Sequence, residues 1–471
     1  MSSLCICNLG LLVTCAPETL TKTATSSAKP TGTEPSSPKR RHASDDPLGR
    51  VLGPAVIFID ENKKVKYCGS EVDCPFSFTD EADVTVDGSG LIALPGLVDC
   101  HTHAVWAGSR AEEFAERLRG VSYVDIQLRG GGINSTTRAT RAASVAELYA
   151  SAQARVDKLV RINGATTVEI KSGYGLSVEA EAKMLEVADK IRVKSNGVGA
   201  GGRAEGPRVV RTFLGAHLVP SEFRDDKEKY VRQVISEQIP RCKGIADHID
   251  VFVDKGAFTL DEGRRILEAG KQAGMKIKAH AEQIEHTGVA KLVADMGGLS
   301  ADHLERVDAE AASEMAKKNV VGVLLPGAQW YLKDIPPPAP MLREHGVKMA
   351  VSTDLNPGSS PVYDLIQCAT MCCVMQGLTP EEAILGVTRH AGLALGDDRL
   401  GWLGPGSVGD VAIFRPPPGE AATIESLIQF SGGYECVSCV RDGSLLFNSG
   451  LPTSSSAGLG KRKKISKQAS L

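Results

Sequence analysis

Eight short apolar segments, separated by amphipathic stretches, lie between residues 94 and 353 of this 471-residue chain. They lie near residues 94–101, 166–171, 208–216, 248–253, 276–281, 298–302, 320–325 and 347–353. The stretches between them have the apolar spacing of helices, as in residues 144–162, 178–193, 259–273 and 308–317. Strands that alternate with helices predict parallel βαβ units, and eight repeats predict an α/β fold of the (β/α)8 TIM-like barrel class. An open, doubly wound sheet is the main alternative.

Shorter runs with β-strand alternation flank the predicted barrel, which we place at residues 94–395. They occupy residues 1–16 and 51–93 before it and residues 396–451 after it, and we expect them to combine into one small β domain. Residues 17–50 are rich in Ser, Thr, Pro and Lys, and residues 452–471 are Ser-rich and then basic. Such segments cannot bury a core, so we predict that both are disordered.

The totals of the chain exclude several classes of function. A net charge of −3 favours neither nucleic-acid binding nor membrane-surface binding. The apolar run at residues 4–13 is too short to span a bilayer, so we expect neither a signal peptide nor a transmembrane helix. The twelve cysteines form no disulfide framework and predict free thiols in a reducing, cytoplasmic compartment. Gly197, Gly199 and Gly202 match G-x-G-x-x-G, but they follow a helical stretch and precede a strand, the reverse of a dinucleotide site.

Ligand-type side chains follow three of the predicted barrel strands, at the ends where barrel active sites form. His101 and His103 end the first strand and share one of its faces, because side chains two apart on a strand point the same way. His280 ends the fifth strand and Asp354 the eighth. A lone histidine is usually a core residue and a lone aspartate a helix cap. Three neutral imidazoles and a carboxylate together predict a site for one divalent or trivalent ion, zinc or iron.

Several short motifs resemble the imidazolonepropionases of the amidohydrolase superfamily. They lie at residues 94–103, 106–114, 169–176, 214–217, 280–283 and 352–359, and the resemblance covers most of residues 51–450. The pieces at 106–114, 169–176 and 352–359 are more specific than the His-x-His piece, which many amidohydrolases share. The resemblance implies a mononuclear metal in a (β/α)8 barrel that is flanked by a small β-sandwich. It also implies hydrolysis of 4-imidazolone-5-propanoate to N-formimidoyl-L-glutamate, a step of histidine degradation.

The same resemblance implies a set of residues that contact a small-molecule substrate. By motif these are Arg110, Tyr174, His217, Gln283, Asn356, Gly358 and Ser359. The substrate carries a carboxylate on a flexible propionate arm, which the guanidinium of Arg110 can bind in bidentate fashion. Nucleic acid and membrane are not expected partners, and a homodimer is one assembly consistent with this assignment.

The expected chemistry is attack of a metal-activated hydroxide on the ring carbonyl, with His217 helping to stabilise the oxyanion. Some relatives carry Glu three residues after the strand-five histidine, whereas this chain has Gln283, which cannot act as a base. Asp354 and His303 are therefore the candidates for proton transfer. Glu282 is expected to face away from the site, and no lysine is predicted to bridge a second ion.

Two other functions stay open at the level of sequence. The first is another amidohydrolase, such as a nucleobase deaminase, with the same metal and a different pocket. The motifs around Arg110 and Tyr174 disfavour it. The second is a non-catalytic scaffold with an amidohydrolase fold, which the presence of all four ligand residues disfavours.

Overall fold

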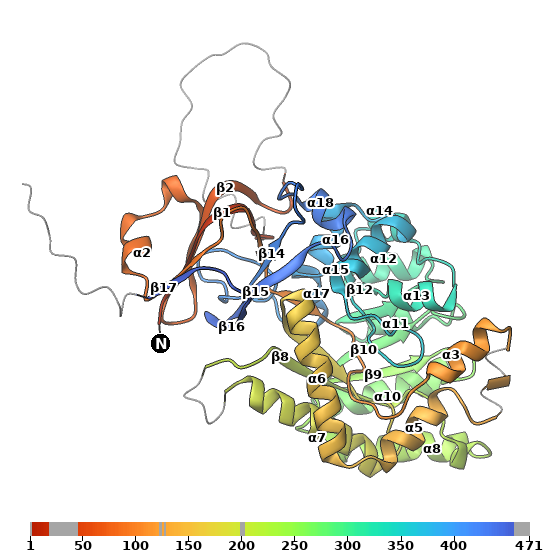
Figure 1. The fold of residues 1–471 in the computed structure, drawn as a ribbon. Helices are drawn as coiled ribbons and strands as arrows, with labels where there is room; N and C mark the ends of the chain where they lie inside the picture. The colour runs from red at the N-terminus through yellow and green to blue at the C-terminus, as the bar shows by residue number, and fades with distance from the viewer. Residues whose placement is uncertain (1, 18–45, 122–124, 127–128, 198–202, 456–471) are drawn as a thin grey trace, which may run out of the picture.

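The computed structural model describes residues 2–17, 46–121, 125–126, 129–197 and 203–455 (Figure 1). The predicted disordered segments fall largely outside these ranges, at residues 18–45 and 456–471. Residues 198–202 of the glycine-rich stretch are also outside them.

Eight parallel strands form the barrel in the order β13-β12-β11-β10-β9-β8-β7-β6. They are β6 (Leu97–Asp99), β7 (Ala165–Lys171), β8 (Arg208–Ala216), β9 (His248–Val253), β10 (Lys276–Ala281), β11 (Ser300–His303), β12 (Val321–Leu324) and β13 (Met349–Val351). Two hydrogen bonds join the first strand to the last beyond their ends. Asp354 N donates to His101 O (3.0 Å), and His103 N donates to Leu355 O (2.9 Å). Each predicted segment overlaps one barrel strand, so the predicted (β/α)8 fold is confirmed.

Helices follow the barrel strands and cover them from outside (Figure 1). The main ones are α3 (Ala111–Leu118), α5 (Ile133–Ala142), α6 (Val145–Asn163), α7 (Val178–Ser195), α8 (Lys227–Gln233), α10 (Leu260–Gln272), α11 (Val289–Asp295), α12 (Ala309–Lys317), α13 (Pro326–Leu332), α14 (Ala339–Glu344), α15 (Leu365–Met371), α16 (Pro380–Gly386) and α17 (Arg389–Ala394). Helix α6 begins with a capping box, in which Ser144 and Glu147 each bind the backbone N–H of the other. It ends at Gly164, whose left-handed backbone (φ 64°) favours glycine.

Nine strands from both ends of the chain form one separate sheet, which is the predicted small β domain. They are β1 (Leu4–Val13), β2 (Arg50–Ile59), β3 (Val65–Ser70), β4 (Val84–Asp87), β5 (Ile92–Pro95), β14 (Val411–Arg415), β15 (Glu435–Arg441), β16 (Ser444–Asn448) and β17 (Thr453–Ser455). The two ends of the chain meet where β5 pairs with β14 in antiparallel register. Figure 1 shows this sheet beside the barrel.

The apolar run at residues 94–101 is divided between the two sheets, which the sequence did not indicate. Leu94 pairs with Ala412 in the β domain, whereas Leu97 pairs with Ala165 in the barrel. Gly96 lies between them, and a Cβ there would lie 2.3 Å from the side chain of Thr166. Only glycine therefore fits the crossing point.

The β domain also extends past both of its predicted limits. β17 lies within the segment predicted as a tail from residue 452, and it pairs with β4. Leu48, within the segment predicted as disordered from 17 to 50, is fully buried. Backbone pairing with β4 holds β17, and burial of the Leu48 side chain holds the chain near residue 48. Amino-acid composition reveals neither interaction. The division of the chain into domains is otherwise still a prediction.

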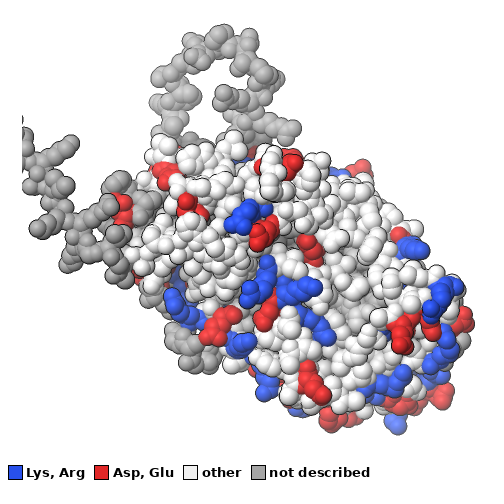
Figure 2. Space-filling view, in the orientation of Figure 1, with Lys and Arg blue, Asp and Glu red and all other residues white. Residues whose placement is uncertain are grey.

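Surface charge, helix length and the state of the cysteines relate to nucleic-acid binding, membrane insertion and disulfide formation. On the face shown in Figure 2, basic and acidic side chains are interspersed. None of the described helices is long and apolar enough to cross a membrane. All twelve cysteines lie in described ranges and are free thiols.

Candidate metal centre and active site

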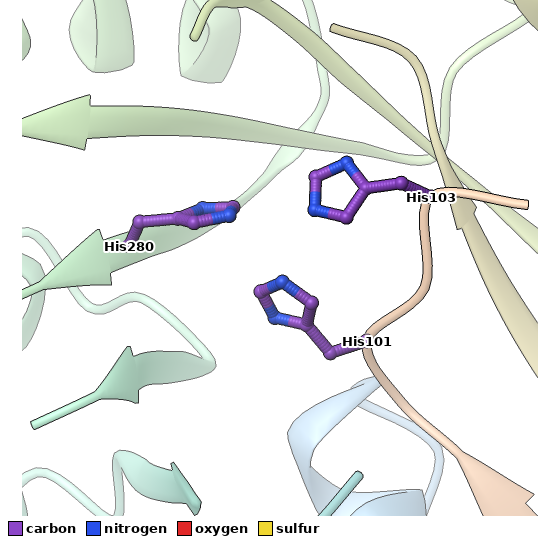
Figure 3. Close-up of side chains that lie close together, drawn as sticks. All are labelled: His101, His103 and His280. Carbon is purple, nitrogen blue, oxygen red and sulfur yellow. The ribbon is translucent and has the colours of Figure 1, made fainter. Parts of the chain in front are cut away.

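Three imidazoles face one another at the C-terminal ends of the barrel strands (Figure 3). His101 and His103 lie on the segment after β6, and His280 lies on β10. One ligand nitrogen of each lies within 4.8 Å of the other two, and all three residues are buried. The structure thus brings together the three predicted histidine ligands.

Two of these rings each have a buried carboxylate within hydrogen-bond distance of Nδ1. Asp302 Oδ2 lies 2.7 Å from His101 Nδ1, and Asp250 Oδ1 lies 3.0 Å from His280 Nδ1. Burial lowers the pKa of both histidines, so each ring is neutral with its proton on Nδ1. That state leaves Nε2 free to bind a cation. Nε2 of His101 is buried and has no hydrogen-bond partner among the described residues, so these residues fit a metal ion.

A buried ion-pair network lies beside these carboxylates. Lys171 Nζ lies 2.6 Å from Asp250 Oδ2, 3.0 Å from Glu169 Oε2 and 3.8 Å from Asp302 Oδ2. Lys278 Nζ also lies 3.0 Å from Glu169 Oε2. Burial opposes the charge of Lys171, but the carboxylates of Asp250 and Glu169 outweigh it and raise the pKa of Lys171. One ammonium group therefore contacts both carboxylates that orient the histidines.

Asp354 and His303 lie beside the three histidines. Asp354 Oδ1 lies 3.6 Å from Nε2 of both His101 and His103. Burial raises the pKa of Asp354 to about 7, although the charge of His303 opposes this rise. Burial alone would lower the pKa of His303, but the nearby Glu305 carboxylate, 3.7 Å from His303 Nδ1, raises it above its usual value. Both residues have left-handed backbones (φ 51° and 86°), a strained conformation that is common at functional sites.

A cavity of about 220 Å³ opens beside the three histidines. Its walls include all seven residues predicted to contact substrate and four of the predicted metal and proton-transfer residues. They are Arg110, Tyr174, His217, Gln283, Asn356, Gly358 and Ser359, together with His103, His280, His303 and Asp354. His101 does not line the cavity and lies fully buried beside it.

Arg110 packs against the turn that follows β13. A Cβ on Gly358 would lie 2.8 Å from Arg110 Nη1, so glycine allows this close approach. Asn356 fixes the turn, because its Oδ1 accepts hydrogen bonds from the backbone N–H groups of Gly358 and Ser359, both at 2.8 Å. Arg110 Nε is bonded to the carboxylate of Glu113.

Gln283 and Glu282 point in different directions, as predicted. Gln283 lines the cavity. The buried Glu282 carboxylate instead accepts hydrogen bonds from the backbone N–H groups of Thr287 and Ala290, at 2.5 and 3.1 Å. Glu282 thus binds the turn that leads into α11 and does not face the histidines.

Comparison with known proteins assigns the chain to a family. The model of the Amidohydrolase family matches residues 92–443. An imidazolonepropionase of Idiomarina loihiensis is 41% identical over 79% of this chain and 88% of its own length. Those of Aeromonas salmonicida and Geobacillus kaustophilus are 46% and 41% identical, over 70% and 83% of this chain and 78% and 89% of their own lengths. The chain belongs to the imidazolonepropionases of the amidohydrolase family.

Solved structures of low sequence identity share the fold. An amidohydrolase from an environmental sample of the Sargasso Sea has a TM-score of 0.62 at 16% identity, over 95% of this chain and 94% of its own. A Xaa-Pro dipeptidase has a TM-score of 0.61 at 18% identity, over 94% and 99%. At these identities the likeness concerns the barrel and its β domain alone.

The imidazolonepropionase motifs did not lead to every residue around the site. The cavity is also lined by Ile133, Phe252, Ile284, Leu332 and Asp334, most of which lie on loops or at element ends and have no periodic signal. The buried network of Lys171, Glu169, Asp250 and Lys278 was missed too. Here a signal existed, because Glu169 and Lys171 are charged residues two apart on one face of an otherwise uncharged strand.

Proposed function

We propose that this enzyme hydrolyses 4-imidazolone-5-propanoate to N-formimidoyl-L-glutamate, as a step of histidine degradation. The observation that carries the proposal is the single cavity that joins Arg110 at its wall to His103, His280 and Asp354. A ring carbonyl near the histidines and a carboxylate at Arg110 would match the two ends of this substrate.

We propose that His101, His103, His280 and Asp354 hold one metal ion, zinc or iron. When bound, such an ion polarises a carbonyl and lowers the pKa of a coordinated water toward about 7. The carboxylates of Asp302 and Asp250 support binding because they keep two imidazoles neutral and fix their tautomers.

Asp354 and His303 are the proposed proton carriers. Asp354, whose Oδ1 lies 3.6 Å from Nε2 of both His101 and His103, can accept a proton from water and deliver it to the leaving nitrogen. His303 lies in the same cavity wall, and its raised pKa favours the protonated form that donates. Gln283 contributes no base and is assigned to hydrogen bonding with substrate.

The tautomer of His217 favours a role other than the predicted stabilisation of the oxyanion. Its Nδ1 lies 2.9 Å from the carbonyl oxygen of Gly173, which can only accept, so Nδ1 carries the proton. Burial lowers the pKa of His217 to about 4, so at neutral pH its Nε2 is an acceptor. We therefore assign His217 to accept a hydrogen bond from a substrate N–H rather than to donate one to the oxyanion.

The experiment is metal analysis combined with turnover of imidazolone propanoate, for wild type and His280→Ala. We expect the variant to lose bound metal and activity together, because one ligand is removed. His345→Ala, which changes an exposed histidine at the end of α14, should keep both. Wild-type metal content or wild-type activity in His280→Ala would refute the assignment.

Assays on the same purified protein distinguish the two alternative functions. A nucleobase deaminase would turn over guanine or cytosine in place of imidazolone propanoate. A non-catalytic scaffold would stay folded without metal and turn over none of the three compounds. Cytoplasmic location and a homodimer are still predictions from sequence.

A further inference from the structure

Glu113 lies in the first turn of α3 and binds two separate loops. One of its carboxylate oxygens, Oε2, is bonded to Arg110 Nε. The other, Oε1, accepts a hydrogen bond from Ser135 Oγ (2.8 Å). The backbone N–H of Gly132, at the start of α5, donates to both oxygens, 3.1 Å from Oε1 and 3.2 Å from Oε2. The side chains of Arg110 and Glu113 are only 9% and 18% exposed. Glu113 thus fixes Arg110 to the beginning of α5.

The bond to Glu113 decides which edge of the guanidinium can meet a ligand. In the described part of the chain, the hydrogen bond from Nε is the only one that the guanidinium of Arg110 makes. Gly358 packs against Nη1 on another side of the group. Nη1 and Nη2 therefore form the edge left for a bidentate carboxylate. A side chain that is already ordered loses less conformational entropy when it binds a ligand.

We propose that Glu113 is a positioning residue that gives the site its preference for a substrate with a carboxylate on its arm. This rests on the proposed function of Arg110. Glu113 holds the guanidinium so that Nη1 and Nη2 meet the carboxylate end-on. The same ring with a neutral arm gains nothing from this arrangement.

The test compares wild type with Glu113→Gln, Arg110→Ala and the double variant. Glutamine has one acceptor oxygen, so it cannot serve both Arg110 and the start of α5. We expect Glu113→Gln to raise KM for imidazolone propanoate roughly 10- to 100-fold, the range for a lost hydrogen bond to a charged group. The value of kcat should stay within about threefold, because the contact is remote from the reacting ring. Glu112→Gln, exposed on the same helix, should keep the wild-type KM.

A double-mutant cycle separates positioning from a structural role. In the Arg110→Ala background, Glu113→Gln should change KM by less than about twofold, because no guanidinium is left to orient. An additive rise in KM would refute the proposal, and so would a wild-type KM in the single variant. If Glu113→Gln does not fold, Ser135→Ala removes one donor to Glu113 and should raise KM by a smaller factor, with wild-type KM again refuting the proposal.

An unreactive probe separates this inference from the proposed function. We would titrate 3-(imidazol-4-yl)propanoate and its amide into wild type and Glu113→Gln. We expect wild type to bind the acid more tightly than the amide and Glu113→Gln to lose that difference. The inference stands on this result even if wild type fails to hydrolyse imidazolone propanoate, which would refute only the proposed function. Equal binding of acid and amide by wild type would refute the inference.

Discussion

Two of the three clustered imidazoles, those of His101 and His280, depend on a carboxylate buried behind them. Asp250 shows this most clearly, because it contacts both His280 and Lys171. We predict that Asp250→Asn lowers metal affinity about 10- to 100-fold, the usual cost of losing such an outer partner. The physical reason is that a neutral amide stabilises the Nδ1 proton of His280 less well than a carboxylate.

A competition titration with a chelator would measure this affinity. Asp247→Asn is a matched control, because Asp247 precedes β9 at the opposite end of the barrel and pairs with Arg211. It should keep wild-type affinity. An unchanged affinity in Asp250→Asn would show that the carboxylate does not support the metal site.

At the scale of elements, the end of α6 depends on one glycine. Gly164 has a φ of 64°, and a Cβ there would lie 2.5 Å from the Cβ of Ala412 in β14. We predict that Gly164→Ala lowers the free energy of unfolding by roughly 2 kcal/mol or more, from backbone strain and overpacking together. Urea denaturation would measure this loss.

The chain offers a control that isolates the backbone component. Gly346 also has a left-handed backbone (φ 81°), but a Cβ there would meet no atom within 4 Å. Gly346→Ala should therefore cost only the conformational penalty, about 1 kcal/mol. Equal losses in the two variants would mean that the contact with Ala412 does not constrain residue 164.

The loop after β7 depends on a buried acid of α7. Glu181 accepts hydrogen bonds from the backbone N–H groups of Gly173, Gly175 and Leu176, at 2.9, 2.7 and 2.7 Å. This loop carries Tyr174, which lines the cavity. We predict that Glu181→Gln, with one acceptor oxygen fewer, raises KM about 10-fold and destabilises the fold by about 1–3 kcal/mol.

Steady-state kinetics and urea denaturation would test this prediction. Glu179→Gln changes an exposed residue of the same helix and should leave KM and stability as they are. A Glu181→Gln variant with wild-type KM would show that the loop holds Tyr174 without this carboxylate.

At the scale of the whole molecule, a partly buried histidine far from the cavity, His390, makes stability depend on pH. His390 Nδ1 lies 2.9 Å from the carbonyl oxygen of Met349. Burial lowers the pKa of His390 to about 4 from an ordinary 6.5. The unfolded chain therefore binds a proton that the folded chain does not, between about pH 6.5 and pH 4.

Stability from this group is complete above pH 6.5 and is lost as the pH falls toward 4. The loss is at most on the order of 3 kcal/mol. His390→Gln should flatten the pH dependence of the unfolding free energy in this window, whereas the exposed His345→Gln should not. Identical slopes for His390→Gln and wild type would contradict the prediction.

The barrel, the family and the four proposed ligand residues could be predicted from the sequence. Strand and helix periods are local properties, and His101, His103, His280 and Asp354 each lie at or just beyond the C-terminal end of a strand that this period identifies. Short motifs named most of the polar residues that line the cavity, because the ends of parallel strands meet at one side of a barrel, but they did not name the apolar ones.

The tertiary structure was needed to show which buried charged side chains form ion pairs and where residues 94–101 divide between the two sheets. Lys171 and Asp250 are 79 residues apart, and no spacing rule pairs them. Leu94 and Leu97 are both leucines and both fully buried, yet they belong to different sheets. An apolar pattern therefore cannot show where one sheet ends and the other begins. The proton on His217 and the bonds of Glu113 to Arg110 and Ser135 likewise depend on distances in space. The local sequence pattern indicates which residues are buried and whether a segment is a strand or a helix. The interaction partners and the protonation state of a side chain depend on which segments the fold brings together.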